Sequence, residues 1–282
     1  MRARQFKTQS DLDRHIAKGY GAGEGENYLP WLRIQDVPSR GRSRKVQGTK
    51  VNRIHHLLSD FEFWYLLLLE FSEEVVDIRE QFPLFPTPEA QQIAASLGII
   101  YPRYPSTAVP FVMTTDFVVT LVDETGRRRM AARTLKYEDE FASAKELQRR
   151  LEKFELEKAI WASKGEMDWK IVTPDMIGQI VISNLQWLRK GAKPARHLVH
   201  PDLHHNFLDH LNYFYSRERT LSAVIRAAAT ATRLPYADGV LTFKNLVWQK
   251  AILFNIRKDE LKLTSYCPVL TFPSAQSSRK VA

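Results

Sequence analysis

The sequence predicts a chain of two parts, an α/β domain over residues 1–173 and a mostly helical domain over residues 174–282. Three observations support this prediction. Runs of β-forming residues alternate with helical patterns before Thr173, Pro174 marks a change of pattern, and the segments after it are nearly all helical in period. With 282 residues and 44% apolar side chains, the chain is long enough to bury two cores.

The chain is basic, with a formal net charge of +9 and a pI near 9.6. Polyanions, and nucleic acid first among them, are therefore the expected macromolecular partners. A single cysteine, Cys267, excludes a disulfide within the chain and a zinc site built from cysteines, and we expect it in the core. The apolar run at 61–71 is too short to span a bilayer and the basic start has no apolar run behind it, so we expect a cytoplasmic protein without a membrane partner.

The N-terminal part begins with a short helical pattern at 11–18, followed by four glycines within residues 19–25 that forbid regular structure. No acidic residue occurs from 40 to 53, where glycines and serines separate six cations: Arg40, Arg42, Arg44, Lys45, Lys50 and Arg53. This composition predicts an extended basic arm. Two interpretations are open, a solvated loop or a set of phosphate contacts that bind DNA without regard to its sequence.

The pattern of residues 55–71 predicts a helix that is apolar on almost every side and is buried against a sheet. Glu62 lies within this apolar surface and has two interpretations. Ser59 and Glu62 have the S-x-x-E spacing of a capping box, which ties back the start of a helix. Alternatively, Glu62 points toward the same site as a second acid and shares a divalent cation with it. We expect the neighbouring His55 and His56 to be hydrogen-bonded structure.

Residues 75–82 predict a strand that Pro83 ends. The following stretch, 83–111, contains six prolines around one short helical piece at 89–97. Proline lacks the amide hydrogen that both helices and inner strands use, so we expect an irregular excursion here.

A hairpin comes next, with a turn at Gly126, which supplies the left-handed backbone position that a three-residue loop favours. Such a loop pairs residue 123 with residue 127, which places Thr134 opposite Asp116. Lys136 then lies two residues further along the same face. A carboxylate beside an ammonium on a sheet is either a cross-strand ion pair or part of a site.

A long helix is predicted at 143–163, with Gly165 placed to stop it, and a short strand at 169–173. A strand–helix–strand crossover of this length implies that the last strand is parallel to the hairpin strand before the helix. The buried face of the helix is expected to contain Leu147, Leu151, Phe154, Leu156, Ile160 and Trp161.

The second domain shows four helical patterns and then a predicted strand pair, at 175–188, 201–215, 220–234, 243–254 and 261–272. Short helices followed by a β-wing favour a winged-helix-like domain. Its start holds five histidines whose role the sequence leaves open: His197, His200, His204, His205 and His210. The one-turn spacing of His200 and His204 leaves a zinc site as an alternative to ordinary surface histidines.

Hydrolysis of a phosphodiester requires a metal ion to bind the phosphate and activate water, with a cation nearby to stabilise the charge that develops on phosphorus. Glu62, Asp116 and Lys136 form such a set. The order helix–strand–strand–strand–helix–strand, with an acid on the second strand and a lysine on the third, resembles the restriction-endonuclease-like PD-(D/E)xK core.

A more specific resemblance is to the TnsA family, the endonuclease subunits of heteromeric cut-and-paste DNA transposases. It is carried by six stretches that run in order along the chain: Tyr28-Leu29-Pro30-Trp31-Leu32, Val37-Pro38-Ser39-Arg40-Gly41-Arg42-Ser43, His55-His56-Leu57-Leu58-Ser59-Asp60-Phe61-Glu62, Asp77-Ile78-Arg79-Glu80-Gln81-Phe82-Pro83-Leu84, Met113-Thr114-Thr115-Asp116-Phe117 and Leu151-Glu152-Lys153-Phe154-Glu155-Leu156-Glu157. The resemblance covers about residues 18 to 190, the nuclease domain and the start of the second.

The resemblance implies that Glu62 and Asp116 bind the metal and that Lys136 is the catalytic lysine. Two positions before the lysine the family commonly has glutamine, where this chain has Thr134, a neighbour of the site that brings a hydroxyl but no charge. Two carboxylates suffice for one Mg²⁺, with Mn²⁺ as the expected substitute, whereas a second tightly bound metal is not implied.

The resemblance also implies partners. These are double-stranded transposon-end DNA cut at the 5′ ends, a separate DDE transposase, TnsB, that cuts and joins the 3′ ends, and an ATP-dependent regulator, TnsC. Two alternatives stay open: a stand-alone restriction or repair nuclease of the same fold, and a nuclease-inactive adaptor that binds DNA or the regulator. The sequence does not determine the transposon, the way its target is chosen, the cleavage position, the number of metals or the oligomeric state.

Overall fold

The computed structural model describes residues 4–37, 42–137, 144–165 and 167–273. It divides into two compact units, Met1–Met176 and Ile177–Ala282. The division falls within a short helix, α5 (Pro174–Ile177), three residues beyond the boundary expected after Thr173. Each unit is described by itself.

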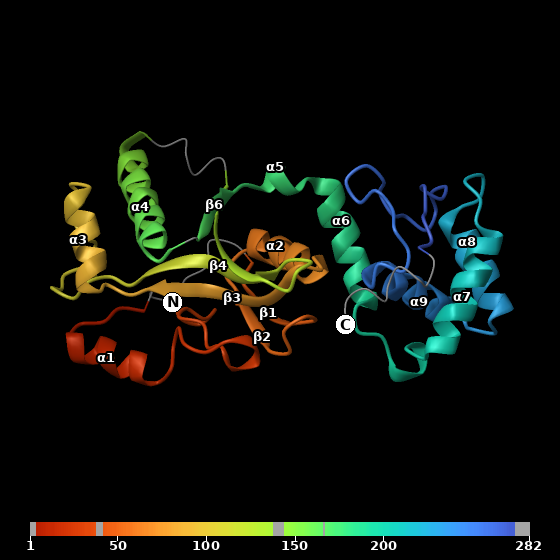
Figure 1. The fold of residues 1–282 in the computed structure, drawn as a ribbon, viewed down its shortest axis with the longest axis horizontal. Coiled ribbons are helices and arrows are strands. Elements are labelled where there is room, and N and C mark those ends of the chain that lie inside the picture. Colours follow the sequence, from red (N-terminus) through yellow and green to blue (C-terminus); the bar gives the residue numbers. More distant parts are fainter. Residues whose placement is uncertain (1–3, 38–41, 138–143, 166, 274–282) are drawn as a thin grey trace. The chain divides into compact units, whose positions relative to one another are not determined.

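The first unit is built on a four-stranded sheet in the order β3-β4-β5-β6 (Figure 1). Its strands are β3 (Val75–Leu84), β4 (Met113–Val122), β5 (Arg128–Leu135) and β6 (Asp168–Val172). Neighbours are antiparallel except for β5 and β6, which are parallel, so the predicted hairpin and crossover are both present. Pro83 does not end β3 as expected but pairs with Thr114. An edge strand tolerates proline because its outward positions need no amide hydrogen.

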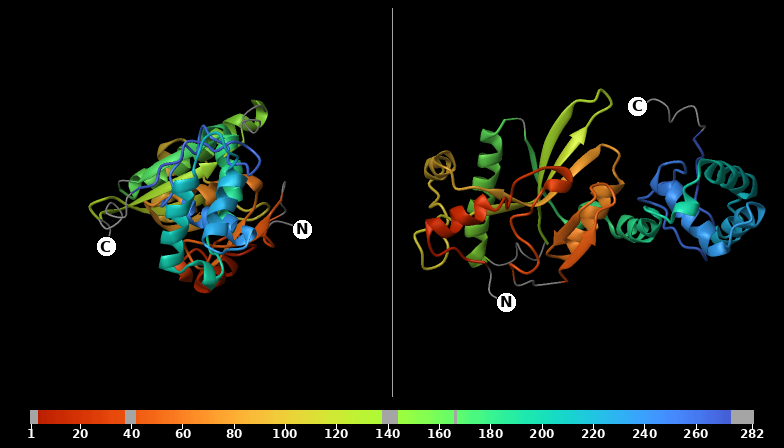
Figure 2. Two further views of the ribbon diagram at one scale, coloured as in Figure 1. Left: turned by 90° about the vertical axis from the view of Figure 1, so that its right-hand side faces the viewer. Right: turned by 90° about the horizontal axis from the view of Figure 1, so that it is seen from below.

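Helices cover both faces of this sheet (Figures 1 and 2). On one face, α3 (Pro88–Ser96) and α4 (Ala144–Ser163) share a core with β4 and β5 that includes Val118, Ala132 and Trp161. On the other, α1 (Gln9–Ala17) packs with a second core formed by Phe6, Leu12, Trp31, Tyr104, Val109 and Val112. The burial predicted for Leu151 is wrong, because its side chain is 47% exposed on the outer side of α4.

The segment expected to be an extended arm forms a second, two-stranded sheet of β1 (Arg44–Gln47) and β2 (Ile54–Leu57). The following helix, α2 (Asp60–Phe71), begins later than predicted. His55 and His56 belong to β2, because Ser59 has an extended backbone and caps the helix with its hydroxyl, which accepts the N–H of Glu62.

The second unit is helical, with α6 (Gln179–Leu188), α7 (Pro201–Phe214), α8 (Leu221–Ala231) and α9 (Tyr236–Trp248). Short 3-10 turns lie at Arg189–Gly191 and Arg196–Leu198 in this unit and at Gly25–Asn27 in the first. As expected, Cys267 is buried and free. Within the described part of the chain, no helix is both long and apolar enough to cross a bilayer.

The strand pair predicted at 261–272, the wing of the winged-helix-like domain, is wrong. This segment makes its backbone hydrogen bonds with other parts of the unit: the carbonyls of Leu263 and Ser265 accept from the first two amides of α8, at 2.8 and 2.9 Å. The start of a helix has unpaired amide hydrogens that need acceptors, and this segment supplies them instead of pairing with itself.

Candidate active site

A pocket of about 330 Å³ opens between the four-stranded sheet and α4. Asp116 from β4, Thr134 from β5, Lys136 just after β5 and Glu157 from α4 contribute to its lining. The hairpin register places Phe117 opposite Arg133, so Asp116 and Thr134 face each other as the loop geometry predicted. The structure therefore brings together three residues expected at one site, Asp116, Thr134 and Lys136.

Backbone geometry fixes the orientation of Asp116. Its Oδ2 accepts the N–H of Leu135 at 2.7 Å across the β4–β5 pair. The carboxylate is thereby held at the end of β5, next to the point where Lys136 leaves the sheet. Pairing of the two strands thus determines the positions of both the acid and the lysine.

Glu157 is a buried carboxylate that the sequence-based site did not include. Its Oε1 accepts the hydroxyls of Thr115 and Thr134 at 2.5 and 2.7 Å. Indole N–H groups of Trp161 and Trp169 in turn donate to these two hydroxyls, at 2.9 and 3.2 Å. Burial raises the pKa of Glu157, the hydroxyl hydrogen bonds lower it, and the negative charge of Asp116 raises it again.

A signal for Glu157 was present in the sequence. It lies between Leu156 and Ile160 on the apolar face of α4, where an acidic residue needs a buried partner. Thr134 also acquires a role: it carries no charge itself but holds the carboxylate that α4 supplies.

Glu62, from the first turn of α2, does not belong to the lining of this pocket. Its carboxylate accepts from the amide of Leu58 at 2.8 Å, the hydroxyl of Ser59 at 3.3 Å and the side-chain amide of Gln81 at 3.4 Å. Burial, followed by the charge of Asp116, raises the pKa of Glu62 to about 8. The two acids therefore interact electrostatically.

The capping-box interpretation of Glu62 is correct only in part. Ser59 caps the helix through its hydroxyl, but the carboxylate of Glu62 takes the amide of Leu58 rather than that of the capping residue itself. Glu62 thus stabilises the start of α2 while its charge interacts with Asp116.

Gln81 connects Glu62 to β4 and has an unusual backbone conformation. It has a φ of 49°, although it lies within β3, between the paired residues Glu80 and Phe82. Its amide donates to Glu62, and its Oε1 accepts from the hydroxyl of Thr114 at 3.5 Å. A non-glycine residue in this region costs about 1–3 kcal/mol, a strain that tends to occur at functional sites.

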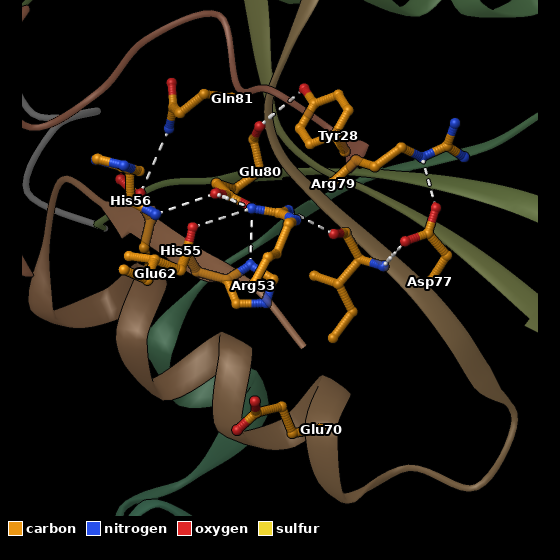
Figure 3. Close-up of polar contacts among 12 residues, drawn as sticks. Tyr28, Arg53, His55, His56, Glu62, Glu70, Asp77, Arg79, Glu80 and Gln81 are labelled. Atoms are coloured by element: carbon orange, nitrogen blue, oxygen red, sulfur yellow. Dashed lines mark hydrogen bonds and ion pairs between the residues drawn. The ribbon is translucent and has the colours of Figure 1, made fainter. Parts of the chain in front are cut away.

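Arg53, predicted to contact DNA, is part of a buried ion pair instead of the exposed surface. Its guanidinium is buried and donates to both carboxylate oxygens of Glu80, with a distance of 2.8 Å to Oε1 (Figure 3). His55 Nδ1 lies 2.8 Å from the same carboxylate, and the backbone amide of His56 bonds to it at 3.0 Å. Burial alone would raise the pKa of Glu80, but hydrogen bonds from Arg53 and His55 lower it to about 2.

Other cations of this segment also have partners within the protein. Arg44 forms an ion pair with Asp60 and lies 4.4 Å from the ring centre of Phe63. Lys50 donates a hydrogen bond to the carbonyl of Ser72. The prediction that this pair contacts phosphate is therefore not supported, because the fold already uses both side chains.

Arg42 and Lys45 are exposed and keep the predicted potential to contact phosphate. Arg40 lies outside the described residues. The six-residue DNA-binding set is thus reduced to two described cations.

The histidines of the second unit do not form a metal site. Three of them lie near a single acid each: His197 near Asp238, His200 near Asp202 and His205 near Asp209, at 3.5, 3.7 and 3.4 Å. Nε2 of His204 lies 2.6 Å from the carbonyl of Leu198. No group of three or more potential ligands gathers anywhere in the described part of the chain, so the zinc alternative has no support.

Hard oxygen donors dominate the chemistry of the pocket region. Burial and like charge raise the pKa of both Glu62 and Glu157, so each acid favours its protonated form beside Asp116. A divalent cation with oxygen ligands would lower these pKa values and favour the carboxylates that bind it. Since no triple cluster of ligating side chains occurs among the described residues, hydroxyl, water or phosphate oxygens would complete its shell.

Comparison with known proteins agrees with this chemistry. The family model described as TnsA-like endonuclease N terminal matches residues 72–174, and that described as TnsA endonuclease C terminal matches residues 177–256. Together they cover more than half of the chain. The transposon Tn7 transposition protein TnsA of Escherichia coli is 41% identical over 181 residues, which are 64% of this chain and 63% of the Tn7 protein, less than two thirds of its length.

Proposed function

Because the chain belongs to the TnsA endonuclease family, we propose that it is the DNA-cleaving subunit of a transposase, hydrolysing phosphodiester bonds at the 5′ ends of a transposon during cut-and-paste transposition. The observation that carries the proposal is the pocket in which Asp116, Lys136 and Glu157 meet. All three lie within the stretch that matches the N-terminal endonuclease family model. In fold terms, the first unit is proposed to be a restriction-endonuclease-like nuclease core.

In the proposed mechanism, Asp116 and Glu62 would hold the cation, and Lys136 would stabilise the negative charge that develops on the phosphate. A bound Mg²⁺, or Mn²⁺ in its place, would supply a Lewis acid for the phosphate and lower the pKa of water. Thr134 keeps Glu157 oriented toward the same pocket through its 2.7 Å hydrogen bond. Gln81 keeps Glu62 directed toward β4.

The proposed setting is a cytoplasmic assembly on double-stranded transposon-end DNA. A TnsB-type DDE transposase would act on the 3′ ends, and a TnsC-type ATP-dependent regulator would control both enzymes. The related Tn7 protein is itself a transposition protein, which supports a role within such an assembly.

The division of labour between the two units is a further part of the proposal. Residues 1–176 should fold alone and keep the nuclease pocket, while residues 177–282 recruit partners. Expression of both pieces tests this division: an insoluble first fragment beside a soluble full chain would mean that the units share a core.

A cleavage assay tests the proposed function. End-labelled transposon-end DNA is incubated with the full chain and Mg²⁺ or Mn²⁺, with and without the partner transposase. Metal-dependent nicks at the 5′ ends that require the partner support the proposal. Cutting of any duplex without a partner indicates a stand-alone nuclease, and DNA binding without cutting under every condition indicates an inactive adaptor.

A matched set of variants assigns the cleavage to this pocket. Lys136→Ala should remove cleavage and keep metal binding, because the ammonium acts on the phosphate rather than on the cation. Lys170→Ala, which removes an exposed lysine of β6 beside Asp168, serves as the control and should cut like the wild type. An active Lys136→Ala enzyme would contradict the mechanism.

A further inference from the structure

Two cations on α4 line the nuclease pocket, and neither the proposed mechanism nor the sequence motif gives them a role. They are Arg150, which is partly buried, and Lys153, which is exposed. Both share the pocket lining with Lys136 and Glu157. The helical side of the pocket thus carries positive charge in addition to Glu157.

Helical spacing explains why these cations meet the acid. Residues 150, 153, 154 and 157 follow the i, i+3, i+4, i+7 pattern that places side chains in one row along a helix. Phe154 belongs to this row, and Nζ of Lys136 lies 6.0 Å from its ring centre. Lys136 from the sheet and the two cations of α4 therefore converge on one row of side chains.

Neutralising Glu157 is a simpler role for these cations, but its surroundings argue against it. The carboxylate of Glu157 accepts the hydroxyls of Thr115 and Thr134, and its pKa is raised by burial. A paired cation would have the opposite effect on that pKa. The pKa of Glu157 is thus set by burial, by its hydroxyl partners and by the charge of Asp116.

The length of the row fits a nucleic-acid strand. At 1.5 Å per residue, Arg150 lies about 10 Å along the helix from Glu157. Lys153 lies between them, about 6 Å along the helix from Glu157. Guanidinium and ammonium groups at this spacing could contact phosphates next to the one beside the acids.

We propose that Arg150 and Lys153 form a phosphate-binding row on α4 that holds the backbone of the DNA strand next to the scissile phosphate. The inference rests on the proposed nuclease function and adds the surface that positions its substrate. Arg42 and Lys45 are the exposed cations in the described part of segment 40–53, so this row would add phosphate contacts beside the acids to those predicted there.

The test compares two double variants of the full chain that remove the same charge from the same helix. Arg150→Ala with Lys153→Ala removes the proposed row. Arg149→Ala with Lys158→Ala is the control, because both residues are exposed on α4 outside the pocket lining. Binding of a fluorescein-labelled transposon-end duplex is measured by anisotropy over a series of salt concentrations, with Ca²⁺ in place of Mg²⁺ to prevent cutting.

The first pair should weaken binding and lower the slope of log affinity against log salt by about 0.9 for each phosphate that the variant no longer binds, or about 2 in all. The control pair should keep the wild-type slope. Equal losses in both pairs, an unchanged first pair, or a wild type without salt-dependent binding would overturn the proposal. If the first pair melts earlier than the wild type, Arg150→Gln with Lys153→Gln, which keeps a polar side chain and more of the stem than alanine, replaces it.

Single-turnover cleavage separates this inference from the proposed function. The first pair should need more DNA for half-maximal rate and reach the wild-type rate at saturation, because a positioning contact acts on binding. A wild type that never cuts refutes the nuclease function but leaves the binding comparison intact. A lower saturated rate with unchanged binding would refute the row and leave the nuclease function standing.

Discussion

Two buried glutamates in the first unit have opposite electrostatics. Glu80 is fully buried on β3 and Glu62 is 6% exposed on α2. The pKa of Glu80 is lowered to about 2, whereas that of Glu62 is raised to about 8. Burial acts on both in the same direction, so their neighbours make the difference.

Those neighbours distinguish a glutamate that stabilises the fold from the one proposed to bind a metal. Arg53 and His55 surround Glu80, so the protein itself balances its charge. Glu62 receives neutral donors from Leu58, Ser59 and Gln81, and the charge that acts on its pKa is that of Asp116, which repels it. A buried acid balanced inside the protein stabilises the fold, while one left unbalanced is available to an external cation.

The largest loss of cleavage is expected when the charge of Asp116, which raises the pKa of Glu62, is removed. Asp116→Asn should lower cleavage by about three orders of magnitude or more, which is roughly 4 kcal/mol of activation free energy. The melting temperature should stay the same or rise, because the change removes a repulsion that acts on both Glu62 and Glu157. Cleavage of transposon-end DNA in Mg²⁺ and a thermal melt measure the two effects; a variant that cuts well would place the site elsewhere.

Glu80→Gln should have the opposite result, in which stability rather than cleavage is lost. Breaking a buried ion pair leaves Arg53 without its counter-charge and costs about 3–5 kcal/mol of unfolding free energy. The control is Asp60→Asn, which removes the partner of Arg44 in a partly exposed pair and should cost about 1 kcal/mol or less. Urea unfolding of both variants measures the two losses of unfolding free energy. Equal losses would mean that the buried pair of Glu80 contributes no more to stability than the partly exposed pair of Asp60.

The pH dependence of stability sharpens the comparison further. Between about pH 4.5 and 8 the folded chain keeps a proton on Glu62 that the unfolded chain has lost, so this group lowers stability as pH rises. Glu62→Gln should remove that loss, which amounts to at most about 1.4 kcal/mol per pH unit. Glu80 acts oppositely: its contribution is present above about pH 4.5 and is lost as pH falls toward 2.

Urea unfolding of the wild type and Glu62→Gln across this pH range measures the difference directly. A constant difference in unfolding free energy between the two proteins would mean that Glu62 is ionised throughout this pH range.

Cleavage by the same variant separates the two roles of Glu62. Glutamine keeps an oxygen for the amide of Leu58, so a folded, inactive variant indicates a metal ligand and a fully active one indicates a helix cap alone.

The smallest effect is expected at Thr134. Thr134→Ala removes one of the two hydroxyls on Glu157 and should cost about 1 kcal/mol of stability, with a moderate loss of cleavage. Thr134→Ser keeps the hydroxyl and should behave like the wild type. Equal damage in both variants would point to packing against Trp169 rather than to the hydrogen bond.

Local sequence determined much of the first unit. Gly126 and the β-forming residues around it specified the hairpin, whose register alone brings Thr134 opposite Asp116. The crossover through α4 specified the parallel β6. Turn chemistry and side-chain period act over a few residues, so a sequence displays them directly.

Only the tertiary structure decided where charges are balanced. Arg53 and Glu80 are 27 residues apart, and no local pattern shows that one buries the other, so a cation expected on the surface is part of the core. Glu157 contacts Thr115 and Thr134 from α4, a helix that follows both strands in the sequence. In the second unit, carbonyls of segment 261–272 accept hydrogen bonds from the start of α8, and the segment does not form strands. The composition of the chain determines how many charged groups it carries. The free energy of each charged group depends on long-range packing, because it is set by the burial of that group and by its distance from the nearest opposite charge.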